Sequence, residues 1–288
     1  MLKKYSTFLL VAIIITAITL QSCKNKVEKE NTIAVSIIPI KYFVDRIVGD
    51  KWEVFSVIPP NANHTTYEPV PSDLKKVAKA KIFFESGNMG FEDAWIERFK
   101  SISADCQFVD ISDNIQKMGG HYHDGEYHGA DPHYWLSPSD AAIIADNIAY
   151  TMIQIDPDNS EFYQDNYQKL KADIAVVADS LYKMLKPISG SAFLIYHPSL
   201  TYFAHDFSLQ QIAIEEHGKE PSAAYMAQII DIAKEKNIKT IFYQSQYSGQ
   251  SVENIAKEIG ATTICFDPLA YNWDTNLLEI GVLLIENE

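Results

Sequence analysis

The sequence predicts an α/β protein of two lobes, in which parallel sheets flanked by helices are joined by one long rigid helix. Short apolar runs typical of strands alternate with stretches of helical spacing, and this alternation occurs twice along the chain. Between the two series lies a helical stretch from Ser160 to Lys186 that contains few helix breakers. A helix of about 27 residues spans roughly 40 Å, which is long for a globular domain. The 288 residues also suit two domains of about 150 residues each.

Strands and helices alternate in the first half of the chain. Strands are predicted over 32–38, 54–58, 81–85 and 107–111, and helices over 42–48, 71–80 and 91–100. Ser72, which directly follows Pro71, is the expected N-cap of the second helix. Because strands separated by helices form βαβ units, these strands are expected to run parallel.

The second half repeats the alternation after a pair of helices. Ser137-Pro138-Ser139 begins a helix that runs to about Ile155, and the turn at 156–159 separates it from the long helix. Further strands are predicted over 192–196, 208–214, 239–243 and 262–266, with helices over 223–236 and 251–259. We therefore divide the chain into an N-terminal lobe at 32–158, a linking helix at 159–187 and a C-terminal lobe at 188–288.

Residues 1–22 have the features of a lipoprotein signal peptide. Two lysines precede an apolar run over 8–20, and about 13 apolar residues are too few to span a bilayer comfortably. The run ends in Leu20-Gln21-Ser22-Cys23, which resembles the cleavage site of bacterial lipoproteins. On that resemblance Cys23 is the lipidated N-terminus, residues 23–31 are a flexible tether, and the protein is held by its lipid on the extracytoplasmic (periplasmic) side of the bacterial cell envelope.

Composition excludes several classes of protein. A net charge of −14 argues against nucleic acid as a partner, because phosphate binding needs a basic surface. The 12 % of aromatic residues argues against a disordered acidic chain. Three cysteines are too few for a disulfide framework or a multi-cysteine zinc site. We expect Cys106 and Cys265 to be separate buried thiols in different lobes.

Four candidate metal ligands lie near the ends of predicted elements, two in each half of the chain. His197 and Asp267 directly follow strands, His64 follows the strand that ends at Ile58, and His133 precedes a helix. Open α/β sheets bind ligands at the carboxyl ends of their strands, and imidazole and carboxylate groups both suit Zn²⁺. Spacing alone leaves plainer alternatives open, because a lone histidine after a strand is more often a surface residue and an aspartate before Pro268 often forms a turn.

A histidine-rich segment at 119–129 is a second candidate metal-binding feature. It contains His121, His123 and His128 among four glycines and two acidic residues. Such a segment buries little apolar surface, so we expect a mobile loop that captures metal weakly near the cleft, with a plain solvated loop as the alternative.

Other polar and aromatic residues near the candidate ligands have plainer interpretations. His205 is expected to be a satisfied polar group near a helix end, and His217 is expected in a surface loop. We expect Trp135 to pack at the lobe interface, and Tyr67 and Glu68 to orient His64.

Four short segments together resemble a known family. Residues 59–69 contain Pro59-Pro60 and then His64 and Tyr67-Glu68-Pro69, and residues 131–138 read Asp-Pro-His-Tyr-Trp-Leu-Ser-Pro. Tyr196-His197-Pro198 and residues 265–269 complete the set. Their order, their spacing and the intervening histidine-rich loop resemble the cluster A metal-binding proteins of bacterial ABC importers, the zinc and manganese solute-binding lipoproteins. The resemblance covers essentially the whole mature chain.

This resemblance implies a metal site in the cleft between the two lobes, with His64, His133, His197 and Asp267 as ligands. Manganese members tend to have a carboxylate at the third position, so His197 favours Zn²⁺ as the ion that is bound. The implied function is high-affinity capture of extracytoplasmic Zn²⁺ and its delivery to an ABC-type membrane permease. We expect a monomer that is not an enzyme, because a closed shell of four ligands leaves no position for an activated water.

Four alternatives remain open at this point: a manganese-binding member of the same family, a secreted zinc hydrolase, an adhesin lipoprotein, and an importer component for metal chelates. A hydrolase would need an open metal position and a nearby general base, and the sequence contains neither a His-Glu-x-x-His nor a Gly-x-Ser-x-Gly motif.

Overall fold

The structure, a computed structural model, describes residues 31–119, 121–123, 126–215, 219–244 and 249–286. Residues 31–288 form one compact unit. The buried apolar residues of the described part of the chain lie inside this unit.

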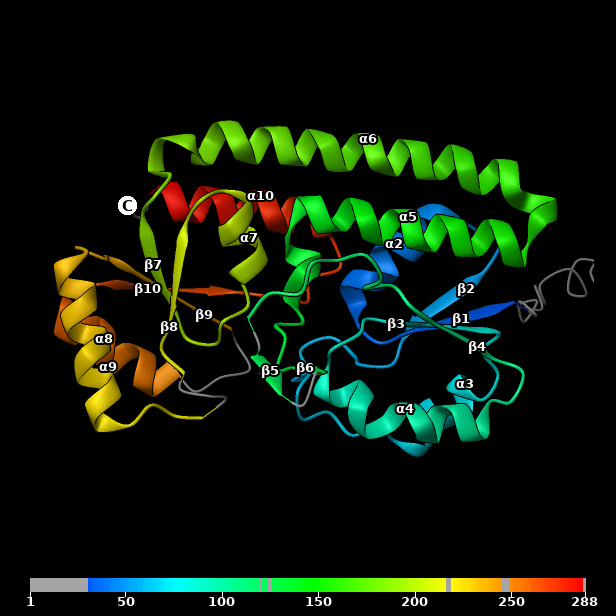
Figure 1. Cartoon of the computed structure of the whole chain (residues 1–288), viewed down its shortest axis with the longest axis horizontal. Coiled ribbons are helices and arrows are strands. Elements are labelled where there is room, and N and C mark those ends of the chain that lie inside the picture. Colours follow the sequence, from blue (N-terminus) through cyan, green and yellow to red (C-terminus); the bar gives the residue numbers. More distant parts are fainter. Residues whose placement is uncertain (1–30, 120, 124–125, 216–218, 245–248, 287–288) are drawn as a thin grey trace, which may run out of the picture. The chain divides into compact units, whose positions relative to one another are not determined.

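The N-lobe is built on a parallel four-stranded sheet in the order β2-β1-β3-β4. Its strands are β1 (Thr32–Val35), β2 (Glu53–Ser56), β3 (Ile82–Glu85) and β4 (Gln107–Asp110), and its helices are α2 (Ile38–Val48), α3 (Pro71–Val77) and α4 (Gly90–Ile102). Figure 1 shows α2 on one side of this sheet and α3 and α4 on the other. The carboxyl ends of all four strands therefore meet at one edge, as parallel strands require.

The C-lobe repeats the design with a parallel sheet in the order β10-β9-β7-β8. Its strands are β7 (Ala192–Ile195), β8 (Gln210–Ala213), β9 (Thr240–Gln244) and β10 (Thr262–Phe266), and its helices are α7 (Thr201–Asp206), α8 (Ala223–Glu235) and α9 (Gly249–Ile259). The predicted fold class, two parallel sheets flanked by helices, is confirmed.

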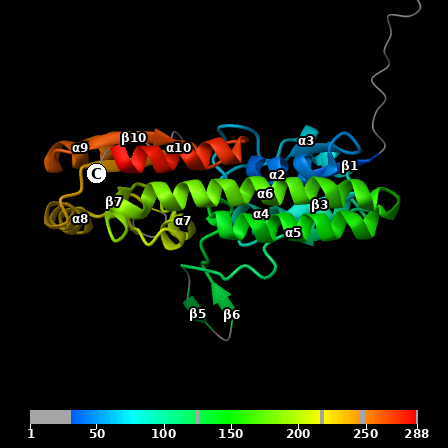
Figure 2. The ribbon, with the colours of Figure 1, turned by 90° about the horizontal axis from the view of Figure 1, so that it is seen from above.

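Three helices form a layer that runs alongside both sheets (Figures 1 and 2). They are α5 (Pro138–Ile155), α6 (Ser160–Leu185) and α10 (Trp273–Glu286), and α6 packs against the other two and against α2. Ser137 caps α5, because its hydroxyl accepts the Asp140 N–H. The long helix expected over 160–186 is α6, and it links the N-lobe to the C-lobe.

Buried apolar side chains form two clusters among the described residues. The larger cluster extends through the N-lobe, the helical layer and part of the C-lobe sheet. The smaller one lies between the C-lobe sheet and the helices α8 and α9. Because the larger cluster crosses the lobe boundary, opening the lobes by a hinge would expose apolar surface to water and cost free energy.

Two tryptophans form hydrogen bonds that connect the lobes at this boundary. Trp135 is fully buried and donates its indole N–H to the carbonyl of Pro268, at 2.9 Å. Trp273, at the start of α10, donates in turn to the carbonyl of Trp135, at 2.6 Å. A segment of the N-lobe is thus held to the chain that leaves β10, and the expectation that Trp135 packs at the lobe interface is confirmed.

Several details differ from the sequence prediction. Ser72 is not the N-cap of α3: Val70 holds that position, and the Asp73 carboxylate accepts the Val70 N–H. The sequence pattern did not predict the bounds of α7 or α10. Cys265 is exposed, not buried, because β10 is an edge strand, and Cys106 is half-buried. The histidine-rich segment contains a short antiparallel pair, β5 (His121–His123) with β6 (Glu126–His128).

The close approach of α10 to α6 gives a test of this packing. A Cβ added at Gly281 would lie 2.5 Å from Leu181 Cδ2 and 3.0 Å from Met184 Sδ, and Leu181 is fully buried. We expect Gly281→Val to lower the free energy of unfolding by about 1–3 kcal/mol through overpacking. Gly90→Val is the control, since nothing lies within 4 Å of a Cβ there. Equal urea midpoints for the two variants would contradict the proposed helix contact.

Candidate metal centre

His64 lies in the loop between β2 and α3, at a turn that Asn63 forms. The Asn63 side-chain oxygen accepts hydrogen bonds from the backbone N–H of Thr65, at 2.9 Å, and from its hydroxyl, at 2.6 Å. An asparagine turn of this kind fixes the chain without regular secondary structure. It leaves His64 6 % exposed.

His133 begins the short 3₁₀ helix η1 (His133–Leu136), which leads into α5. The Asp131 carboxylate accepts the backbone N–H of His133 at 2.8 Å and also contacts the ring Nδ1 at 2.7 Å. The Asp-Pro-His spacing therefore fixes both the backbone and the ring. His133 is 1 % exposed, so its remaining ring nitrogen, Nε2, faces the interior.

His197 lies two residues beyond the end of β7, in the C-lobe. Its carbonyl accepts a hydrogen bond from the Gln244 side chain at 2.9 Å, which ties it to the neighbouring strand β9. Its Nδ1 lies 2.8 Å from Glu215 Oε2, and the side chain of Glu215 is buried. Nε2 is therefore the ring nitrogen of His197 that is left to face a ligand.

The three imidazoles come together although they are distant in sequence. His64, His133 and His197 each offer a ring nitrogen, and these atoms all lie within 4.8 Å of one another. The two Nε2 atoms of His64 and His133 are 3.2 Å apart. Nitrogen ligands about 2.0–2.1 Å from a tetrahedral Zn²⁺ lie about 3.3 Å from one another, so this spacing suits one zinc ion.

Burial keeps the rings of His64 and His133 neutral. The pKa of His64 is lowered to about 2, chiefly by burial and also by the nearby His133 and His197. Burial also lowers the pKa of His133, although Asp131 opposes that shift. For Asp131, burial acts to raise the pKa, but the contacts with His133 outweigh burial and the pKa falls. Neutral imidazoles beside an ionised carboxylate are ready to bind a metal without first losing a proton.

Asp267, the fourth predicted ligand, is part of a turn and is not in the histidine cluster. It follows β10, and its Oδ1 accepts the Leu269 N–H at 2.9 Å in an aspartate turn. Its carbonyl accepts from the Asn276 side chain, at 3.0 Å. Among the described residues, the group of potential metal ligands consists of the three histidines and does not include Asp267. Its role as a ligand stays a prediction.

The histidine-rich segment begins close to the candidate centre. The Asp131 N–H donates to the Met118 carbonyl at 2.9 Å and closes the base of the segment, beside the carboxylate that holds His133. The backbone pairs His121 with His128 and His123 with Glu126. Figure 2 shows this pair of strands apart from both sheets. Its role in metal capture stays a prediction.

Several other predicted residues do not join the cluster. His205 lies on α7 with its side chain 69 % exposed. The Tyr67 hydroxyl donates to Asp73, at 2.8 Å, and does not orient His64, while Glu68 is exposed. His217 and Cys23, the expected loop histidine and lipidation site, lie outside the described residues.

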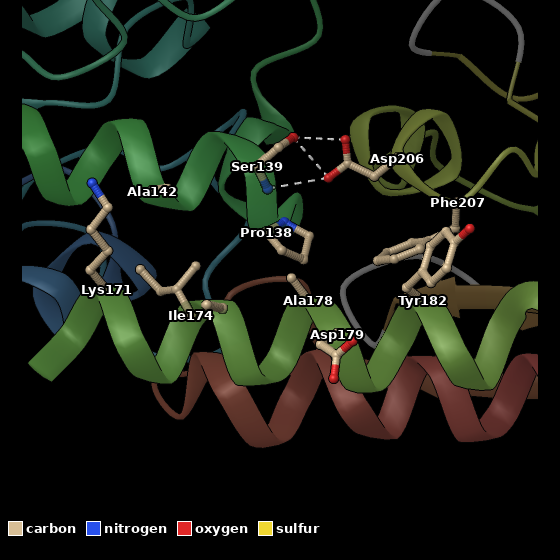
Figure 3. Close-up of a pocket in the computed structure, with 11 residues that line it drawn as sticks. Pro138, Ser139, Ala142, Lys171, Ile174, Ala178, Asp179, Tyr182, Asp206 and Phe207 are labelled. Atoms are coloured by element: carbon tan, nitrogen blue, oxygen red, sulfur yellow. Dashed lines mark hydrogen bonds between the residues drawn. The ribbon is translucent and has the colours of Figure 1, made fainter.

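A pocket of about 660 Å³ lies away from the histidines, between α5, α6 and α7. Its floor is mostly apolar, and Figure 3 shows Asp206 reaching from α7 to Ser139 at the start of α5. The Asp206 carboxylate accepts from the Ser139 hydroxyl, at 2.7 Å, and from the Ser137 hydroxyl, at 2.6 Å. A carboxylate at a helix N-terminus is stabilised by the helix dipole, so Asp206 fastens α7 of the C-lobe to α5.

Two residues of the centre were missed by the sequence reasoning, namely Asp131 and Glu215. Glu215 could have been found by the rule that found His197, because it too follows a strand of the same sheet. Asp131 lies two residues before a predicted ligand, and second carboxylates near ligating histidines are common at metal sites.

A cluster of three imidazoles between two α/β lobes, two of them buried and the third partly buried, with a long helix joining the lobes, defines a metal-ion solute-binding protein. The sequence profile described as "Zinc-uptake complex component A periplasmic" (ZnuA) matches residues 33–276. The chain belongs to this family. Among its described residues, no helix is long and apolar enough to cross a membrane.

Individual relatives are similar over most of their length. The high-affinity zinc uptake system protein ZnuA of Bacillus subtilis is 31 % identical, over 91 % of this chain and 88 % of the relative. A crystal structure of a ZnuA deletion mutant with zinc bound has a TM-score of 0.83 and 37 % identity, covering 89 % of this chain and 97 % of the other. The iron-binding protein YfeA of Yersinia pestis is 27 % identical, over 90 % of this chain and 85 % of the relative.

The low pKa of His64 predicts a pH dependence of stability in the metal-free chain. Between about pH 2 and 6.5 the unfolded state holds a proton on this ring that the folded state does not, so the free energy of unfolding falls as the pH falls. One histidine contributes at most about 1.4 kcal/mol per pH unit. In denaturant unfolding with a chelator, the wild type is expected to lose about 1 kcal/mol more than His64→Asn between pH 7.5 and 5.5. Equal losses would show that His64 is not held neutral.

Proposed function

We propose that this protein captures Zn²⁺ outside the cytoplasm and delivers it to the permease of an ABC importer. The observation that carries the proposal is the convergence of ring nitrogens from His64, His133 and His197 within 4.8 Å. Membership of the ZnuA family supports it, as do the names of the zinc-uptake relatives. The ion is the cargo of the protein and takes no part in a reaction.

The chemistry of the ligand set favours zinc over manganese. Three imidazole nitrogens suit Zn²⁺, whereas Mn²⁺ prefers carboxylate, carbonyl and water oxygens. Asp267 is the proposed fourth ligand, and it would reach the ion if the turn that binds its Oδ1 to the Leu269 N–H opened. A set of three nitrogens and one oxygen remains richer in nitrogen than a manganese site requires.

The arrangement gives little support to a zinc hydrolase. A hydrolase needs a general base beside the metal-bound water. The two carboxylates nearest the rings, Asp131 and Glu215, already contact the Nδ1 atoms of His133 and His197. Neither is therefore available as a base, which supports a binding protein over an enzyme.

We further propose that the protein acts as a lipid-anchored monomer at the extracytoplasmic face of the membrane. The lipoprotein-like segment at 20–23 supports an anchor at Cys23. The folded unit begins at Asn31, so a tether of a few residues would keep it near a permease in the same membrane. The lobes share one core, so we expect only modest closure when the ion binds.

Alanine substitutions test the proposed ligands. His64→Ala, His133→Ala and His197→Ala are each expected to weaken Zn²⁺ binding by at least tenfold, about 1.4 kcal/mol, because each removes one metal bond. His205→Ala is the matched control, since its side chain is exposed on α7. Competition against a fluorescent chelator, with residues 24–288 purified without a histidine tag, measures the affinities.

Two results of that assay would contradict the proposal. One is a loss in His205→Ala as large as the losses in the three ligand variants. The other is displacement of the bound Zn²⁺ from the wild type by a modest excess of Mn²⁺, which would instead favour the manganese-binding alternative.

Deletion of residues 120–129 tests how much of the Zn²⁺ affinity comes from the histidine-rich segment and how much from the proposed centre. Met118 and Asp131 already lie together at the base of the segment, so the shortened chain can close there. We expect the deletion to reduce Zn²⁺ affinity much less than loss of any one of the three clustered histidines, and to leave one equivalent bound. A loss equal to that of His133→Ala would place the main site in the loop.

A further inference from the structure

Glu215 is a buried acidic residue whose position is fixed by the backbone. The hydrogen-bond ladder between β7 and β8 continues past the strand ends: Ile214 N–H donates to the Ile195 carbonyl at 2.8 Å, and Glu215 N–H donates to the Tyr196 carbonyl at 2.9 Å. Continued past the strand ends, the register that pairs Ile195 with Ala213 places Glu215 opposite His197. With its side chain only 6 % exposed, its carboxylate reaches Nδ1 of His197 at 2.8 Å.

A carboxylate at this nitrogen determines what His197 can do. A neutral imidazole carries its proton on one nitrogen and its lone pair on the other, and a carboxylate accepts the proton-bearing nitrogen. With the Nδ1–H directed at Glu215, the lone pair is on Nε2. Contacts of this kind also make a ligating imidazole a better electron donor.

Charge gives a second, independent argument. A divalent cation is costly to bury unless negative charge lies close by. Imidazole ligands that bind through a lone pair supply none, so nearby carboxylates have to supply it. The two carboxylates in contact with the rings, Asp131 on His133 and Glu215 on His197, together carry two negative charges. Both therefore add to the negative charge that the proposed ligand Asp267 would bring to a divalent ion.

We propose that Glu215 is a positioning residue of the metal centre: it holds His197 with its proton on Nδ1 and its lone pair on Nε2, and it adds negative charge close to a bound divalent ion. This inference rests on the proposed zinc function. It assigns one carboxylate to one histidine of each lobe, with Asp131 acting on His133 and Glu215 acting on His197.

Two substitutions separate the two parts of this role. Glu215→Gln keeps an oxygen that can accept the Nδ1–H of His197 but removes the charge, whereas Glu215→Ala removes both. Loss of such a partner typically weakens metal binding by 10–100-fold. We expect about tenfold weaker Zn²⁺ binding for Glu215→Gln and a further loss, toward about 100-fold, for Glu215→Ala. Glu235→Gln, an exposed position at the end of α8, is the matched control.

The experiment uses residues 24–288 and two measurements. Chelator competition gives the Zn²⁺ affinity, and long-range ¹H–¹⁵N NMR of the zinc-free protein reports which nitrogen of His197 carries the proton. The wild type and Glu215→Gln are expected to show the proton on Nδ1, and Glu215→Ala is expected to lose this preference. A change in packing alone would not move the proton between the two nitrogens. If the alanine variant does not fold, the glutamine variant still decides whether the charge matters.

The outcomes for Glu215 and for the zinc function are distinguishable. Wild-type affinity and an unchanged Nδ1–H in both variants would overturn the role of Glu215 while leaving zinc capture intact. Absence of stoichiometric Zn²⁺ from the wild type, or an unchanged affinity in His197→Ala, would overturn the zinc function itself. A normal affinity in Glu215→Gln with a reduced affinity in Glu215→Ala would overturn the charge-supplying part alone.

Discussion

Trp135 is the contact on which the geometry of the metal centre depends. Its ring centroid lies 5.1 Å from that of His133 and 6.5 Å from that of His64, while its indole N–H and its carbonyl both bond to the segment after β10. One buried residue therefore contacts two N-lobe histidines of the candidate centre and joins that lobe to Pro268 and to the start of α10. Because His197 comes from the C-lobe, the distances within the cluster are set by this joint and by the helical layer of α5, α6 and α10.

This frame produces a binding site at some cost to the apoprotein. Burial strongly disfavours protonation of His64 and His133, so the rings stay neutral, and their ring nitrogens face one another across short distances. These two nitrogens lie at hydrogen-bond distance, so one ring can donate to the other, and a divalent ion would replace that contact with metal–nitrogen bonds. Because one core extends across both lobes, release to a permease is easier to explain by movement of the loops that hold His64 and Asp267 than by wide separation of the lobes.

The sequence was sufficient for the features that depend on local pattern. The start of α5 was found from Ser137-Pro138-Ser139, the long helix was found from its lack of breakers, and the histidines were found because parallel strands end at a common edge. Features that depend on tertiary pairing were not accessible. The contact of Glu215 with His197 requires the pairing of β7 with β8, and the exposure of Cys265 follows from the edge position of β10. The turn that holds Asp267 likewise depends on its bond to Leu269 N–H, which spacing alone does not reveal.

The most direct test is an anomalous-difference map at the zinc edge, from crystals of residues 24–288 grown with one equivalent of Zn²⁺. The account predicts a single strong peak between the lobes, about 2.0–2.1 Å from one ring nitrogen of each of His64, His133 and His197. A strong peak on the β5–β6 segment with none between the lobes would contradict it, and so would a peak that touches only one of the three rings.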